Sequence, residues 1–349
     1  MISRKNAAIS KCIIHKVGNK FNSTRNAFSE QPVDFDEASY DLMLSFLLKP
    51  FGNLVQSHRF NHHADISLNE INSYSKQVFM DEKAFIEASK HMVMHLFEQS
   101  NSAQIKTGDV LVVLFDGIGF NDFETQALGV FKIETKVNFF QTFLENNSYD
   151  ILVQKGISSR KLDKGCLILN QSDTEGPVVF SVDNNSYDAQ YWTDHFLNIK
   201  YADDANNHTQ QYLELCKHFS TDIIKSQYGA HEHSNFLAKT IDFFKEHEVV
   251  NVETFKEDLF HEEAHIREFE DYKKSYESEQ NLVMRNQFDV AEAVVNKEKR
   301  KFKTDIRLDT HIQIKLDIDA PDASEEYLER GYDEEKKMHY YKVFFNAEN

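Results

Sequence analysis

One five-residue string, His261-Glu262-Glu263-Ala264-His265, has the spacing of a zinc-dependent hydrolase. In the pattern H-E-x-x-H, two histidines on one helix face bind zinc and the glutamate acts as the general base. The surrounding segment is highly charged, whereas a catalytic zinc needs a shaped and partly dry cavity. At about 100° per residue, both histidines fall on the flank of a thin apolar stripe, where surface histidines are common. We therefore keep a zinc hydrolase only as a hypothesis to be excluded, and we predict no metal site and no catalytic residue.

The other catalytic patterns are weaker. His62-His63 with Asp65, and His231-Glu232-His233, could each supply two metal ligands but lack an evident third. Gly117-Ile118-Gly119 lacks the third glycine and the following helix of a dinucleotide site. The sequence contains neither the phosphate-binding loop G-x-x-x-x-G-K-[ST] nor the nucleophile signature G-x-S-x-G. We predict that the protein is not an enzyme and has no cofactor.

The basic residues are more informative, because they are clustered in an acidic chain. The net charge is −18, from 57 Asp and Glu against 39 Lys and Arg. The C-terminal basic cluster, as we call it, comprises Lys297, Lys299, Arg300, Lys301 and Lys303. If Asp289 caps a helix that runs to about Arg300, this cluster gathers at the C-terminal end of the helix, where the helix dipole favours cations.

A second set, the hairpin basic group, lies in a turn between two predicted strands and comprises Arg160, Lys161 and Lys164. Lysine and arginine in such groups can bind the phosphates of a nucleic acid and release condensed counterions. No aromatic stacking platform or recognition-helix signature accompanies either set. The contacts would therefore be made to the nucleic-acid backbone, without sequence specificity.

The elements that must position these residues follow from apolar periodicity. We predict a strand over residues 8–17 and a helix over residues 37–48, which Pro50 terminates. Short apolar runs then occur at 109–115, 127–134, 149–156, 162–169 and 177–182. Because their spacing leaves no room for crossover helices, they should pair as an antiparallel meander.

The remainder of the chain is predicted to be helical and then to return to strands. Residues 188–280 have helical spacing, and the charged segment 255–279 is typical of a solvated outer helix. Strands are predicted within 304–319 and over 340–345. The predicted fold is therefore α+β: an antiparallel meander with flanking helices, a helical portion and a C-terminal antiparallel strand set. The predicted domains are 1–186, 187–300 and a β segment, 301–349, that could join either of them.

Composition narrows the class of protein further. A chain of 349 residues with 41% hydrophobic residues is long enough for two cores. Cys12, Cys166 and Cys216 are distant from one another, which is typical of reduced thiols in the cytosol. The most apolar run, residues 110–115, is far too short to cross a bilayer, and no signal peptide is evident. We predict a cytoplasmic protein without a membrane partner.

Several segments, spread over residues 8 to 348, together resemble the bacterial nucleoid-associated protein family typified by NdpA and YejK, in the form found in the Bacteroidetes. In order, these segments are 13–19, Arg160-Lys161-Leu162-Asp163-Lys164-Gly165, 204–209, 303–309, Gly331-Tyr332-Asp333, 340–345 and Glu348. The resemblance implies a cytoplasmic protein located at the nucleoid and implies no enzyme activity. It carries over neither a catalytic residue nor a DNA-contacting one.

Two functional hypotheses remain beside the zinc hydrolase. The first is a nucleoid-associated protein that binds double-stranded DNA directly, through the C-terminal basic cluster and the hairpin basic group. The alternative is an adaptor that reaches DNA indirectly, by docking a basic DNA-handling protein. Its docking face would be the acids of the 255–279 helix: Glu257, Asp258, Glu262, Glu263, Glu268, Glu270 and Asp271. The sequence predicts no oligomeric state.

Overall fold

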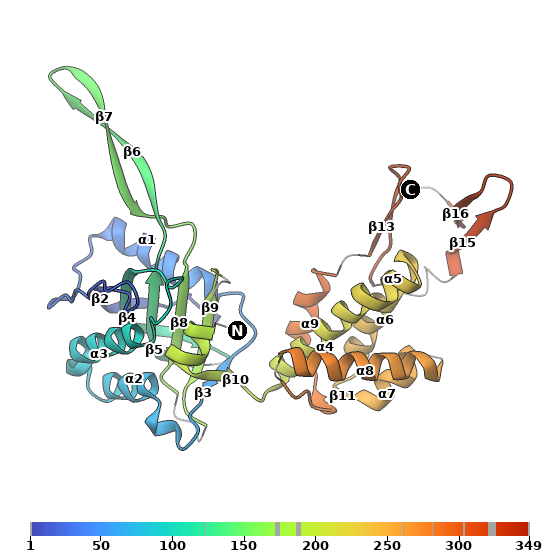
Figure 1. Cartoon of the computed structure of the whole chain (residues 1–349), viewed down its shortest axis with the longest axis horizontal. Coiled ribbons are helices and arrows are strands. Elements are labelled where there is room, and N and C mark those ends of the chain that lie inside the picture. Colours follow the sequence, from blue (N-terminus) through green and yellow to red (C-terminus); the bar gives the residue numbers. More distant parts are fainter. Residues whose placement is uncertain are drawn as a thin grey trace. The chain divides into compact units, whose positions relative to one another are not determined.

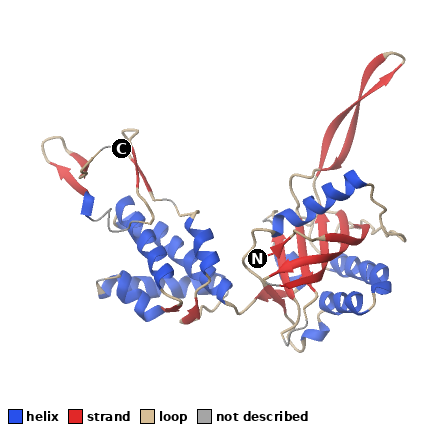
Figure 2. Ribbon diagram, turned by 180° about the vertical axis from the view of Figure 1, so that it is seen from behind, coloured by secondary structure: helices blue, strands red, loops and turns tan. Residues whose placement is uncertain are grey.

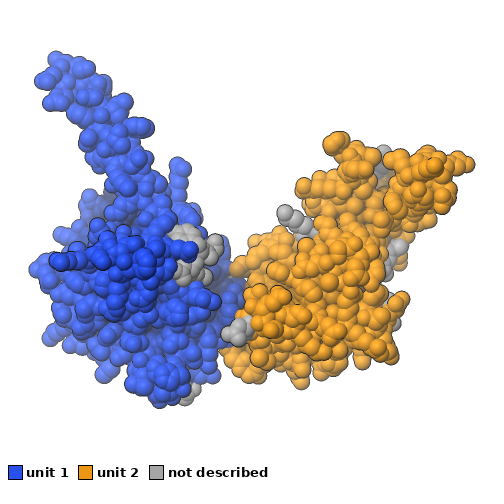
Figure 3. All heavy atoms as spheres, in the orientation of Figure 1, with its two compact units in different colours: residues 1–202 blue, residues 203–349 orange. Residues whose placement is uncertain are grey.

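The polypeptide divides after Ala202 into two units, residues 1–202 and 203–349 (Figure 3). The computed structural model describes residues 2–121, 123–171, 175–185, 190–260, 262–280, 282–302, 304–319 and 326–347. The division lies later than the boundary predicted at residue 186. The reason is that a π-helix, η4 (Tyr191–Leu197), and strand β10 (Ile199–Tyr201) both belong to the first unit.

The first unit is built on an eight-stranded sheet in which every pairing is antiparallel, as the meander prediction requires. The strand order is β1-β4-β5-β8-β9-β3-β10, and β2 pairs with β4. The bounds are β1 Ile2–Ser3, β2 Ala8–Val17, β3 His58–Phe60, β4 Gly108–Phe120, β5 Phe123–Ile133, β8 Lys164–Leu169 and β9 Val178–Asp183. The predicted strand at 8–17 is confirmed.

Helices cover both faces of this sheet (Figure 2). The helices of this unit are α1 Glu37–Leu48, η1 Lys49–Phe51, η2 Ile66–Leu68, α2 Glu70–Met80, η3 Glu82–Ala84 and α3 Phe85–Glu98. Alternate side chains of β4 enter two different cores. Val112 packs in the core with α2 and α3, whereas Val113 packs in the core with α1. Two buried faces explain the unbroken apolar run at 110–115.

A long β-hairpin, β6 (Lys136–Glu145) and β7 (Ser148–Ile157), projects beyond the sheet (Figure 1). The two strands pair with each other along their whole length, from Lys136 opposite Ile157 to Glu145 opposite Ser148. The apolar run at 149–156 therefore forms a strand, but this strand lies outside the main sheet. Strand β6 was not predicted, because the adjacent Phe139 and Phe140 break the alternation that marks a half-buried strand.

The second unit is mainly helical, with three short two-stranded sheets. Its helices are α4 Ala205–Phe219, η5 Ser220–Ile224, α5 Lys225–Gln227, α6 Ala230–Glu246, α7 Val252–Leu259, α8 Glu263–Gln280 and α9 Glu292–Lys299. Its strands are β11 Val249–Asn251, β12 Gln287–Asp289, β13 Asp305–Arg307, β14 Gln313–Lys315, β15 Leu328–Asp333 and β16 Met338–Val343. Within the described part of the chain, no helix has the length and apolarity needed to cross a membrane.

Two details of this unit differ from the sequence prediction. The single helix predicted over 255–279 is two helices, α7 and α8, separated at Phe260, which is buried against other aromatic rings. The packing of the Phe260 ring against Phe219 and Phe236 outweighs the helical propensity of the neighbouring residues. Asp289 does not cap α9: it ends β12, and Ala291 occupies the N-cap position.

Candidate nucleic-acid interface

The C-terminal basic cluster surrounds the end of α9. Val294 and Val295 are fully buried and fix this helix against its unit. After the helix ends, the N–H of Lys301 donates to the carbonyl of Glu298 at 2.8 Å, which tightens the last turn. Phe302 is buried directly afterwards. The turn therefore leaves the intervening Arg300 exposed to solvent.

Acidic neighbours hold two cations of the cluster. Lys299 forms an ion pair with Asp319, a carboxylate that it shares with Lys245. Lys301 pairs with the buried Glu298 at 2.5 Å. These pairs orient the lysine side chains, and they also reduce the positive charge that the cluster presents.

The remaining members differ in exposure. Lys297 is half-buried, and burial followed by the nearby charge of Lys301 lowers the pKa of its amine. Arg300 is exposed and forms no ion pair within the described ranges. Lys303 lies outside the described residues. Arg300 is therefore the cation of the cluster that is best placed to meet a phosphate.

The hairpin basic group separates into surface and core residues. Arg160 and Lys161 are exposed beside the root of the β6–β7 hairpin. Lys164, in contrast, is only 1% exposed, pairs with Asp183 at 2.5 Å and lies 5.6 Å from the centre of the Tyr191 ring. A side chain held in this way is not available to a phosphate, so the predicted role of Lys164 is replaced by a structural one.

Lys164 lies in a buried polar network that the sequence does not predict. Lys132 is fully buried and donates to Glu134 and to the Tyr191 hydroxyl, each at 2.8 Å. Burial lowers the pKa of Lys132, and the charge of Glu134 opposes that shift. Asp163 accepts hydrogen bonds from the N–H groups of Glu134 and Thr135, at 2.7 and 2.8 Å. Lysines in an alternating strand carry no sequence signal that would distinguish these buried cations from surface ones.

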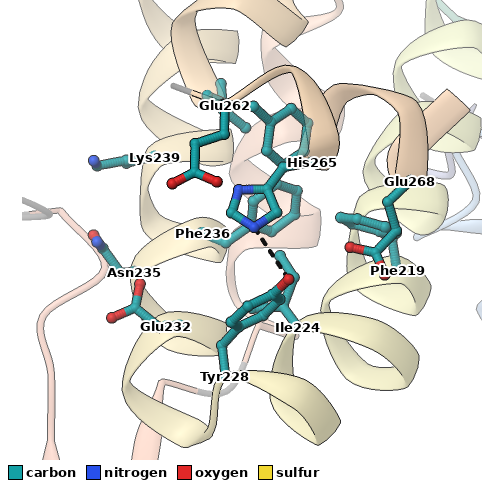
Figure 4. A pocket seen from close by; sticks show the side chains of 12 residues that line it. Phe219, Ile224, Tyr228, Glu232, Asn235, Phe236, Lys239, Glu262, His265 and Glu268 are labelled. Atoms are coloured by element: carbon teal, nitrogen blue, oxygen red, sulfur yellow. Dashed lines mark hydrogen bonds between the residues drawn. The ribbon is translucent and has the colours of Figure 1, made fainter.

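The H-E-x-x-H string does not lie within a helix. Helix α8 begins at Glu263, so Glu262 precedes it, and His261 lies outside the described residues. Figure 4 shows His265 directed toward Tyr228, whose hydroxyl is 3.1 Å from the histidine Nε2. Glu262, the general base of the motif, therefore lies outside the helix that contains His265.

The cavity beside His265 has a volume of about 280 Å³, and aromatic rings such as Phe219 and Phe236 form part of its wall. Among the described residues, no three histidine, cysteine or carboxylate side chains gather as metal ligands. The three cysteines are buried, and burial raises the pKa of the Cys12 thiol to about 12. A thiol with such a pKa is a poor nucleophile.

The acidic residues considered as a docking face are partly neutralised by neighbouring cations. At least three of them form ion pairs: Glu263 with Arg267 at 3.0 Å, Asp271 with Lys274 at 3.2 Å, and Glu270 with Lys256. The net negative charge that this face offers to a basic partner is therefore smaller than the sequence indicates.

Comparison with known proteins assigns the chain to a family. The family model for nucleoid-associated protein YejK matches residues 13–339, which includes the described members of both basic sets. No curated protein matches the chain.

Proposed function

Because the chain belongs to the YejK family of nucleoid-associated proteins, which places it with the nucleoid in the cytoplasm, we propose that it binds double-stranded DNA directly and without sequence specificity. The contact would be made by the C-terminal basic cluster, with Arg300 at its centre, and assisted by Arg160 and Lys161. No catalytic step is part of the proposal.

The exposure of Arg300 at the C-terminal end of α9 is the observation that supports this proposal most directly. A guanidinium presents several donors in a planar fork that matches a phosphate group. The neighbouring Lys299 and Lys301 are already placed by their carboxylate partners, and a phosphate could compete for both of them. Contacts of this kind position a protein on the DNA backbone but do not read bases.

Charge reversal at the cluster tests the proposal. Direct phosphate contact requires that the logarithm of affinity for duplex DNA fall with the logarithm of salt concentration by about 0.9 per contact. In the variant Arg300→Glu/Lys301→Glu, we expect weaker binding and a slope that is smaller by about that amount for each lost contact. Fluorescence anisotropy with a labelled duplex at several salt concentrations measures both quantities.

The matched control reverses two other exposed lysines of the same unit, in the variant Lys274→Glu/Lys336→Glu. This variant makes the same change in net charge, so it should leave the slope near the wild-type value if contact is local. Equal losses in both variants would contradict a local contact and indicate a general effect of charge. Absence of wild-type binding at low salt would refute direct binding and leave the adaptor hypothesis.

A further inference from the structure

The β6–β7 hairpin exposes an apolar surface that the first unit does not cover. Tyr149 and Phe140 are the most exposed of its large side chains, at 78% and 76%. Folded monomers rarely expose contiguous apolar patches of more than a few hundred Å². A two-stranded hairpin without cover is also only marginally stable in water. Such a surface indicates an interface.

The register of the hairpin assigns its side chains to two faces. Residues directly opposite each other share a face, and successive residues alternate. Phe140 opposite Val153 and Leu144 opposite Tyr149 therefore lie on the same side. We call this side the apolar face; its exposed apolar members are Phe140, Leu144, Tyr149, Ile151, Val153 and Ile157. The other face mixes apolar side chains with polar ones such as Gln141 and Gln154, which hydrogen-bond to each other.

The root of the hairpin is held firmly, so the apolar face is presented by a fixed support. Lys136 at the start of β6 pairs with Asp109 of the main sheet at 2.6 Å. Directly before β6, the backbone is tied to Asp163 through the N–H groups of Glu134 and Thr135. A ribbon anchored by these contacts loses less entropy on association than an unanchored loop.

The charges of the hairpin decide which partner fits. Both acids, Glu145 and Asp150, lie toward the tip, and both lysines, Lys136 and Lys155, lie toward the root. The acidic tip would repel DNA phosphates. Both lysines lie on the apolar face, whereas both acids lie on the other face. Antiparallel packing of the apolar faces therefore keeps the lysines of the two copies apart, whereas parallel copies would oppose them.

The available area also suits a pair of identical chains. At about 150–250 Å² for each of the two aromatic side chains, and less for the four partly exposed aliphatic ones, the apolar face offers on the order of 700 Å². This area is close to the ~800 Å² per partner of a standard stable interface. The hairpin as a whole has no net charge, so it can meet its copy without the repulsion expected from a net charge of −18.

We propose that the β6–β7 hairpin is a self-association arm, and that two copies of this chain form a dimer by packing their apolar faces together in antiparallel orientation. The dimer is isologous, because both copies contribute the same surface to the interface. This proposal rests on the hairpin alone and does not depend on DNA binding.

Sedimentation equilibrium of the full chain tests the dimer. The wild type should sediment at twice its 40.7 kDa mass at micromolar concentration. Phe140→Ser/Ile151→Ser should weaken dimerisation at least thirtyfold. The matched control, Phe143→Ser/Leu152→Ser, removes two exposed apolar side chains from the other face and should leave the dimer intact. Because all four residues are exposed, circular dichroism should show unchanged folding.

Cysteine cross-linking tests the orientation of the two arms. Asn138→Cys, near the root of the apolar face, should form no disulfide between copies, because antiparallel arms keep their roots apart. Thr142→Cys, nearer the middle of the same face, should form one under the same oxidising conditions. A wild type that stays monomeric at 100 µM overturns the proposal. The proposal is also overturned if Phe140→Ser/Ile151→Ser and Phe143→Ser/Leu152→Ser weaken dimerisation equally. A disulfide-linked dimer of Asn138→Cys would overturn the antiparallel arrangement.

Discussion

Residues of the same charge have different roles in this protein, and the difference lies in how deeply their side chains are buried. Lys164 and Arg300 both belong to basic groups in the sequence, yet Lys164 is paired in the core and Arg300 faces solvent. His15 is another case. Its Nδ1 accepts a hydrogen bond from the N–H of Ser29 at 3.1 Å, so the neutral ring carries its proton on Nε2 and donates it to the Ser89 hydroxyl at 2.8 Å.

His15 should make stability depend on pH. Burial, assisted by the charge of Lys90, lowers the pKa of His15 from 6.5 to about 4. Between these values the unfolded chain binds a proton that the folded chain excludes. The contribution of neutral His15 to the unfolding free energy is therefore complete above pH 6.5. About 3 kcal/mol of this contribution is lost as the pH falls to 4.

Urea unfolding of the wild type and of His15→Gln at pH 7 and pH 4 measures this contribution. The difference in unfolding free energy between the two proteins should shrink by about 3 kcal/mol at the lower pH. If the difference stays the same at both pH values, His15 is not the group responsible.

At the scale of elements, the sheet is tied to the hairpin by a buried ion pair. Lys132 lies in the buried part of β5, and Glu134 begins the connection to β6. Desolvation of such a pair offsets much of its attraction, so its presence alone does not imply high stability. Removing one partner is different, because it leaves an uncompensated charge in the core.

Lys132→Met should therefore lower the unfolding free energy by about 3–5 kcal/mol, since the carboxylate of Glu134 stays buried. The double variant Lys132→Met/Glu134→Leu should recover a large part of that loss. Denaturant unfolding of the wild type, both single variants and the double variant gives the coupling energy. Equal destabilisation by the single and double variants would contradict the pairing.

At the scale of the whole molecule, the acidic charge is unevenly divided. Residues 203–349 contain 33 Asp and Glu against 20 Lys and Arg, whereas residues 1–202 contain 24 against 19. The proposed DNA contact at α9 thus belongs to the more acidic unit, where local cations must act within repulsive surroundings. The self-association arm belongs to the less acidic unit.

Because each unit has its own buried side chains, we expect the two to unfold separately. Trp192, the single tryptophan, is fully buried in the first unit, so its fluorescence reports that unit alone. Far-ultraviolet circular dichroism is dominated by helices, most of which lie in the second unit. Urea midpoints from the two signals should differ, and coincident transitions would contradict independent unfolding.

The sequence by itself determined the local elements and the family. Apolar periodicity placed the strand at 8–17, the helix at 37–48 and the antiparallel order of the meander, because these features depend on neighbouring residues and short connections. The spread of matching segments indicated the YejK family, which the match over residues 13–339 confirms.

Only the tertiary structure decided which polar residues are buried and which apolar residues are exposed. Lys132 and Lys164 look like surface residues in the sequence, but long-range pairing encloses them. Phe140 and Tyr149 look like core residues, but the hairpin carries them beyond the sheet. Burial depends on contacts between segments distant in the chain, and neither periodicity nor composition records those contacts.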